Sequence, residues 1–176
     1  GPEADAARSE AGQFIKSAMS REWRSFGIHL GYIYLGSPII PVEDRAAPER
    51  DVTQFEQSAV PGARAPHVWL DEGQSTLDLF GRGFVVLDFG GDAAQHAAPL
   101  VDAAVMRGVP IAYHAIDHAQ AAALYERRFV LVRPDGHVAW RGDAMPDHPL
   151  ALIDVVRGAT PLTVSMHTEH TQEIEA

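Results

Sequence analysis

The stretch Phe84-Val85-Val86-Leu87-Asp88-Phe89-Gly90-Gly91-Asp92 decides the fold. Its first six residues are apolar except for one aspartate, a pattern typical of a buried central strand. The glycine pair ends the strand, and Asp92 can cap a helix, with Gln95 three residues later completing a capping-box pattern. We therefore expect a strand followed directly by a helix that starts at Asp92 and stops at Gly108.

Outward from this stretch, strand and helix patterns alternate. Pro134-Asp135-Gly136 lies between two apolar runs and predicts a hairpin, because proline presets φ and glycine accepts a positive φ. The order strand, helix, strand, helix, hairpin, helix predicts an α/β fold with a mixed sheet flanked by helices, an order that resembles the thioredoxin-like fold. The further strands are expected at residues 67–70, 111–116, 129–132 and 137–140, and the further helices at 119–125 and 147–157.

The first 26 residues predict an amphipathic helix. Residues 4–26 contain one glycine and no proline, and they are rich in good helix formers. Apolar side chains at spacings of four and three form one stripe on this helix, made of Ile15, Met19, Trp23 and Phe26. We expect a connector at residues 27–60, the thioredoxin-like domain at 61–158 and an acidic, flexible tail at 159–176.

Composition excludes several classes of function. The 176 residues carry 24 Asp and Glu against 14 Lys and Arg, a net charge of −10. A chain this acidic is poorly suited to nucleic acid, and no apolar run is long enough to cross a bilayer. The sequence has no cysteine, which excludes thiol catalysis, disulfides and thiolate metal sites. We expect a cytoplasmic protein that binds neither nucleic acid nor membrane.

The end of the first core strand resembles the place where thioredoxins carry their reactive cysteine. In this sequence no sulfur nucleophile is present there, and Asp92 stands at the expected helix start. The proline that thioredoxins place before the hairpin strand is also missing, since Tyr125-Glu126-Arg127-Arg128 occupies that position. The resemblance therefore implies a thioredoxin-like fold without the thioredoxin reaction.

Three further strings resemble the C-terminal domain of FAD-dependent aromatic-ring hydroxylases, which include phenol, hydroxyphenylpropionate and polyketide hydroxylases. They are residues 61–70 (PGARAPHVWL), 75–81 (STLDLFG) and 130–141 (VLVRPDGHVAWR). Leu30-Gly31-Tyr32 and Ser37-Pro38 resemble the segment that joins this domain to the flavin-binding body. The resemblance implies a parent enzyme in which FAD, reduced by NAD(P)H, reacts with O2 and hydroxylates a phenolic ring in the N-terminal body.

The same resemblance implies that this chain holds no catalytic, cofactor-binding or metal-binding residue. No G-x-G-x-x-G fingerprint follows a strand near its start. Arg141-Gly142-Asp143 resembles the motif that holds the FAD ribityl chain, but its place after the hairpin predicts a turn. We expect a structural, docking or dimerising role, with the flavin-binding body and a second copy as partners. The candidate interface residues are Arg64 and the apolar stripe of the N-terminal helix.

Two other classes of function stay open, a free-standing thioredoxin-like binding module and a small metal enzyme. The metal reading depends on His114 and His118, whose spacing of four suits a metal site if both lie on one helix. Because residues 111–116 read as a strand, we expect one strand histidine and one loop or capping histidine instead.

The remaining polar patterns predict structural roles. Ser75-Thr76 with Asp78 could pair a nucleophile with a base, but no histidine lies at a recognisable spacing. Arg133 and Arg141 flank the hairpin and predict surface ion pairs with the nearby Asp135 or Asp143.

Overall fold

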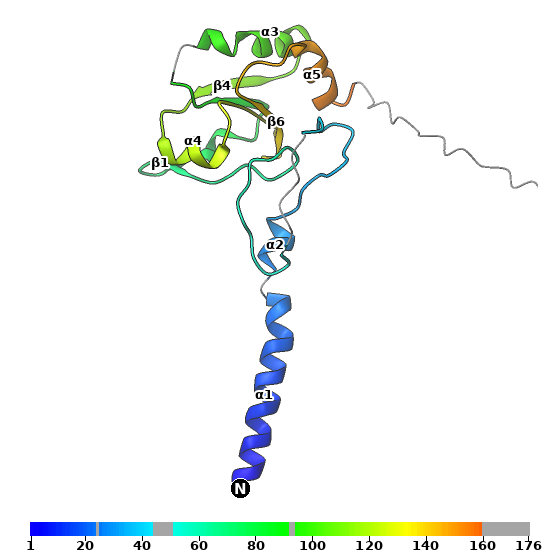
Figure 1. Ribbon diagram of the computed structural model, residues 1–176, viewed down its shortest axis with the longest axis vertical. Helices are drawn as coiled ribbons and strands as arrows, with labels where there is room; N and C mark the ends of the chain where they lie inside the picture. Colours follow the sequence, from blue (N-terminus) through cyan, green and yellow to red (C-terminus); the bar gives the residue numbers. More distant parts are fainter. Residues whose placement is uncertain (24, 44–50, 92–93, 160–176) are drawn as a thin grey trace, which may run out of the picture.

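The computed structural model describes residues 1–23, 25–43, 51–91 and 94–159. The first helix, α1 (Pro2–Trp23), projects from the rest of the molecule, and the short helix α2 (Phe26–His29) lies at its base (Figure 1). The expected acidic tail lies outside the described residues from 160 onward. No described helix is long and apolar enough to span a membrane.

A four-stranded mixed sheet forms the centre of the molecule. Its strands are β3 (Phe84–Asp88), β4 (Ile111–Ala115), β5 (Phe129–Val132) and β6 (Val138–Gly142), in the order β4-β3-β5-β6. β3 runs parallel to β4 and antiparallel to β5, which pairs antiparallel with β6 across the predicted hairpin. Gly136 has a φ of 77° in that turn, as expected for the glycine of Pro-Asp-Gly. The predicted mixed α/β sheet is confirmed.

Helices cover the two faces of this sheet, because successive strand residues point to opposite sides. Val86 and Leu131 pack with α3 (Ala98–Met106) and α5 (Pro149–Val156) in one buried cluster. Val85 and Val130, their neighbours in sequence, pack on the opposite face with Tyr125 of α4 (Ala119–Tyr125). Figure 1 shows α3 and α5 above the sheet and α4 below it.

The segment before β3 adds a smaller layer. β1 (Trp69–Asp71) and β2 (Gln74–Ser75) form a separate two-stranded antiparallel sheet, so the strand predicted at 67–70 does not join the central sheet. A 3-10 turn, η1 (Thr76–Leu79), follows β2. Isolated bridges join Ile33 to Ala63 and Arg64 to His137, which ties the connector to the hairpin.

The starts and ends of two helices differ from expectation. The described helix after β3 is α3, which begins at Ala98 without a side-chain cap and follows a 3-10 turn, η2 (Ala94–His96). Proline at residue 99 explains this start, because its fixed φ and missing N–H suit the first helical turn. Asp92 itself lies outside the described residues.

The amphipathic helix is also shorter than predicted. α1 ends at Trp23, and Ser25, with φ −121°, precedes the separate helix α2 that contains Phe26. The predicted stripe therefore does not run along one helix. Ile15 and Met19 are 55% and 46% exposed on α1, and Phe26 is 61% exposed on α2, while the side chain of Trp23 lies outside the described part.

Candidate functional site

Asp88 at the end of β3 is a buried, heavily bonded polar side chain of the central sheet. It is fully buried, and its Oδ1 accepts hydrogen bonds from the Gly90 backbone N–H (2.8 Å) and from Arg128 Nε (3.3 Å). Its Oδ2 accepts a hydrogen bond from the Tyr113 hydroxyl (3.1 Å). The carboxylate thus receives three donors from three different segments.

The topology of the sheet explains why these groups meet. Asp88 and Val86 point to the same face of β3, and Tyr113 lies opposite Val86 on the parallel strand β4. Phe129, the first residue of β5, pairs with Asp88, so Arg128 enters the same corner of the sheet. This corner is the one in which thioredoxin-like proteins place their reactive group.

Arg128 fills the space beside the glycine pair. A Cβ at Gly90 would lie 2.7 Å from the Arg128 Cζ, so any larger residue there would displace the guanidinium. Arg128 Nη2 donates to His96 Nδ1 (3.2 Å), and its guanidinium lies 4.7 Å from the centre of the Phe129 ring. Arg128 thus holds both the end of β3 and η2.

The groups of this cluster bond to one another and hold the end of β3 in place. Burial, and next the charge of Asp88, raise the pKa of the Tyr113 hydroxyl, which therefore stays a proton donor to the carboxylate. The Asp88 oxygens are bonded and excluded from solvent, so they are poorly placed to take a proton from a substrate. The ion pair with Arg128, whose side chain is 32% exposed, holds the junction between strand and helix.

His114 and His118 lie at the carboxyl end of β4. They line a hollow of about 270 Å³ together with Leu70 and Asp117. His114 is a strand residue whose pKa is lowered by burial, and His118 caps α4, since its Nδ1 accepts a hydrogen bond from the Ala121 N–H (3.2 Å). Among the described residues no three His, Asp or Glu side chains converge as a metal site would need. Both histidines take the structural positions predicted for them.

The hydroxyls of Ser75 and Thr76 stabilise a turn. The Asp78 carboxylate accepts hydrogen bonds from the Ser75 N–H (2.7 Å) and Oγ (2.9 Å), which makes a capping box at η1 and lowers the pKa of Asp78. Thr76 is fully buried, donates to the Pro66 carbonyl (2.7 Å) and accepts from the Val68 N–H (3.0 Å). The Ser75 hydroxyl thus bonds the carboxylate that caps the turn, and the Thr76 hydroxyl bonds backbone groups, so both hydroxyls take structural positions.

Replacing Thr76 by valine tests this structural role. The change keeps the shape but leaves the buried Val68 N–H without an acceptor, so the free energy of unfolding should fall by about 2 kcal/mol. Urea unfolding measures this loss. Thr76→Ser keeps the hydroxyl and should cost less, and an equal loss in both variants would show that the methyl group, not the hydrogen bond, matters.

One of the two predicted surface ion pairs is confirmed and the other is wrong. Arg133 Nη2 pairs with Asp135 (2.8 Å), as expected. Arg141 is instead fully buried and pairs with Glu43 (3.1 Å) and Glu126 (2.9 Å). Since Glu43 lies 98 positions away in sequence, no local pattern could indicate this partner.

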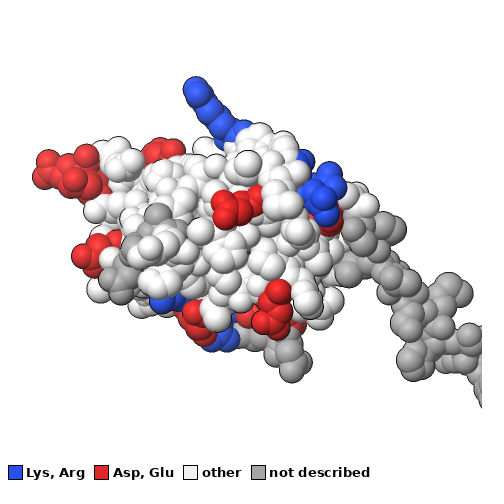
Figure 2. Space-filling view, turned by 90° about the horizontal axis from the view of Figure 1, so that it is seen from above, with Lys and Arg blue, Asp and Glu red and all other residues white. Residues whose placement is uncertain are grey.

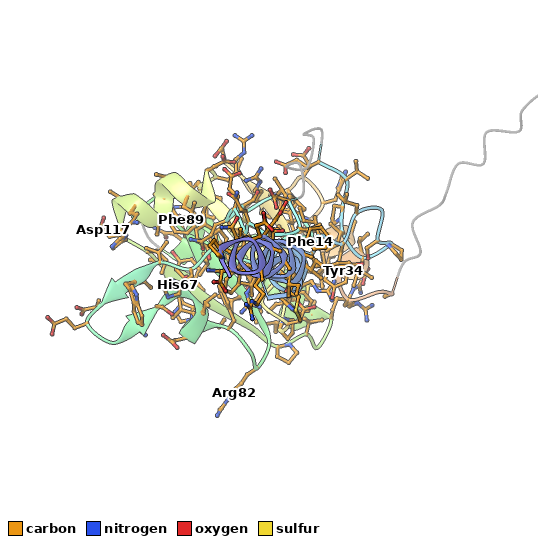
Figure 3. The ribbon with its side chains drawn as sticks, turned by 90° about the horizontal axis from the view of Figure 1, so that it is seen from below. Phe14, Tyr34, His67, Arg82, Phe89 and Asp117 are labelled. Atoms are coloured by element: carbon orange, nitrogen blue, oxygen red, sulfur yellow. The ribbon has the colours of Figure 1, made fainter. Side chains whose placement is uncertain are left out.

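The predicted interface residues do not form one cluster in the described structure. Arg64 is half-buried and lines a hollow of about 320 Å³ between α2 and residues 51–58. The stripe residues of α1 stand apart on the projecting helix (Figure 1). Figure 3, viewed from below, shows that helix end-on with Phe14 on it, and Arg82 pointing away from the body.

Neither the role of Arg128 nor the bonding of Asp88 was predicted from the sequence. The sequence contains one signal, which is the position of Asp88 inside an apolar strand. A buried aspartate nearly always has a bonding partner. The identity of that partner depends on the pairing of β3 with β5, which the sequence pattern does not specify.

Comparison with known proteins gives consistent matches. A family model described as "Aromatic-ring hydroxylase, C-terminal" matches residues 58–160. A 4-methyl-5-nitrocatechol 5-monooxygenase from Burkholderia sp is 34% identical over 85% of this chain and 30% of its own length. A 2,4-dichlorophenol 6-monooxygenase from Cupriavidus pinatubonensis is 34% identical over 83% of this chain and 27% of its own length.

Solved structures agree with these matches. The rebeccamycin biosynthetic enzyme RebC, with reduced flavin, superposes with a TM-score of 0.78 and 43% identity over 91% of this chain and 29% of RebC. The flavin-dependent monooxygenase PieE, solved with FAD and substrate, superposes with a TM-score of 0.67 and 32% identity over 88% of this chain and 29% of PieE. The chain thus spans about three-tenths of the length of the proteins it matches.

Proposed function

The chain belongs to the family of aromatic-ring hydroxylase C-terminal domains, and from this membership we propose that it serves an FAD- and NAD(P)H-dependent aromatic monooxygenase. In that enzyme it packs against a flavin-binding N-terminal body in the cytoplasm, while the hydroxylation takes place in the body. The family match over residues 58–160 carries the proposal, and relatives more than three times as long as the matched region support it.

Two positions in this chain resemble flavin-contacting motifs, and other side chains already occupy both. The strand–glycine–helix layout of β3, Gly90-Gly91 and α3 has the order of a phosphate-binding turn. However, the Gly90 N–H already donates to Asp88, and Arg128 covers Gly90 where a pyrophosphate would have to approach. The Asp143 carboxylate of the ribityl-like motif accepts instead from Arg127 Nη1 (2.8 Å) and from the Arg128 N–H (3.2 Å). These contacts favour a cofactor site in the body.

The exposed apolar side chains of α1 support a protein partner. In the view from the α3 end, basic side chains stand singly and acidic ones are scattered, so this face offers no cationic patch (Figure 2). The apolar side chains of α1, with Phe14 72% exposed, have no covering element among the described residues. Exposed apolar faces of this kind usually become interfaces. In the proposed enzyme the flavin-binding body covers α1.

A test of the proposal uses the protein in its source. An antibody against this chain should detect a flavin-containing protein roughly three times the mass of the chain. The isolated chain, titrated with FAD, should show no saturable change in the visible spectrum. A native protein no larger than this chain, or micromolar FAD binding by the chain itself, would contradict the proposal.

Without the body, α1 should bind a second copy of the chain. We expect the chain to sediment as a dimer, and Met19→Glu to shift it to a monomer, because a charge on the apolar face opposes burial. Gln13→Glu, on the same exposed helix, is the matched control and should leave the dimer intact. If the unchanged chain is monomeric at high concentration, its α1 face needs no cover from a second copy.

A further inference from the structure

We infer that the hollow between α2 and residues 51–58 is a docking site for an acidic segment of the flavin-binding body, whose carboxylate Arg64 receives. This inference rests on the proposed function, because the body belongs to the longer protein. It concerns a surface separate from the α1 stripe.

The hollow has the size and lining of a small recognition site. Its volume is about 320 Å³. One wall consists of α2 and the turn after it, with Leu30 and Tyr32, and the other wall consists of Phe55 and Glu56. Arg64 is the basic residue of this lining. The lining also contains the polar residues Asp51, Gln54, Glu56 and Ser58. The Asp51 carboxylate already accepts hydrogen bonds from the Thr53 and Gln54 N–H groups, so it does not compete for Arg64. Apolar side chains with a few placed polar groups are typical of sites that bind a specific partner.

Arg64 is held in place by its backbone. It forms a bridge with His137, and the Ala65 N–H next to it donates to the Gly136 carbonyl (2.8 Å). The chain on both sides of Arg64 is buried as Ala63 and Ala65. A side chain that projects from such a fixed backbone loses less freedom when it binds a partner.

The guanidinium of Arg64 differs from the other arginines. In the described residues it has no hydrogen-bond or ion-pair partner, although it is half-buried. Arg82 also has none, but it is exposed and points into solvent (Figure 3). A guanidinium that is partly removed from water favours a carboxylate, which can bind it through two hydrogen bonds. The arginines that pair with a carboxylate in the structure are Arg8, Arg107, Arg127, Arg128, Arg133, Arg141 and Arg157.

Apolar side chains line the hollow beside Arg64, and further ones are exposed along its first wall. The segment that forms the first wall leaves four large apolar residues more than half exposed, namely Phe26, Ile28, Tyr32 and Leu35. A charged anchor beside aromatic and aliphatic side chains is the composition of an interface centre. We therefore expect this surface to be buried in the complete protein.

The position of the hollow identifies the occupant. α2 follows α1 after two residues, so a body that packs on α1 lies next to α2 and to the hollow (Figure 1). RebC matches 91% of this chain with only 29% of its own length, which leaves a large body available to fill the site in a relative of this kind. The occupant is therefore a segment of that body with an Asp or Glu side chain.

Arginine-specific modification with phenylglyoxal, read by mass spectrometry, tests this inference. In the isolated chain at low concentration Arg64 should react, whereas in the flavin-loaded longer protein it should react about tenfold more slowly. Arg82 should react equally in both and serves as the internal control. Equal reaction of Arg64 in both proteins would overturn the docking site while leaving the longer flavoprotein, and hence the proposed function, in place. Slow reaction in the dilute isolated chain would also overturn it.

A variant series in the longer protein tests the carboxylate. Amide exchange over residues 51–58 should be slower in the longer protein than in the isolated chain. Arg64→Gln should restore the faster exchange, Arg64→Lys should keep part of the protection, and Arg82→Gln should change nothing, because it removes an exposed charge outside the hollow. Unchanged protection in Arg64→Gln would show that Arg64 receives no carboxylate there.

Discussion

Replacing Arg128 with alanine should lower the free energy of unfolding by about 3 kcal/mol. The change leaves the buried Asp88 carboxylate without its cationic partner and removes the group that holds Gly90 and His96. We place the cost near the lower end for a broken buried pair, because the Arg128 side chain is 32% exposed and water can enter where it stood. Urea unfolding followed by tryptophan fluorescence measures the loss.

Arg127 provides a matched control for this variant. It lies next to Arg128 in sequence, but its pair with Asp143 (2.8 Å) is exposed, with the Arg127 side chain 42% accessible. Arg127→Ala should therefore cost less than about 1 kcal/mol. The double variant Asp88→Asn, Arg128→Ala should lose less free energy of unfolding than the sum of the two single losses. Either single change already breaks the same ion pair. Equal costs for Arg127→Ala and Arg128→Ala would contradict the account of the buried pair.

The central sheet was predictable because its pattern is local. β3 and β5 are buried on both faces, so their runs of apolar residues indicate strands directly. The Pro-Asp-Gly turn connects β5 to β6 through chemistry that three adjacent residues contain. α4 was predicted at its observed bounds, 119–125, for the same reason.

The polar contacts were not predictable in the same way. The Arg141–Glu43 and Arg128–Asp88 pairs join residues 98 and 40 positions apart, so they depend on which strands and segments become neighbours. The family resemblance read from three strings is confirmed by the match to residues 58–160, although the sequence has no cysteine at the thioredoxin-like site. In this domain the end of β3, where the sequence resembles the active-site position of thioredoxins, is occupied by the Arg128–Asp88 ion pair.

Gly27→Ala should release residues 51–54 from α2. A Cβ at this position would overlap the Asp51 carbonyl oxygen and lie 2.6 Å from the Gln54 carbonyl oxygen, and both are backbone atoms that cannot rotate away. The local opening of residues 51–54 should therefore become easier by about 3 kcal/mol, or about 100-fold in amide exchange at Thr53 and Gln54. These two amides now donate to the Asp51 carboxylate (2.6 and 3.1 Å).

The matched control for this variant is Gly12→Ala. Nothing lies within 4 Å of a Cβ at Gly12 on α1, so alanine there should raise helix content and leave the exchange at Thr53 unchanged. The contrast separates the general effect of replacing a glycine from the overlap at Gly27. Because the connector forms one wall of the hollow at Arg64, its release should also abolish the slow reaction of Arg64 in the longer protein. If Gly27→Ala leaves both the exchange and the reaction of Arg64 unchanged, the connector does not pack on α2 as described.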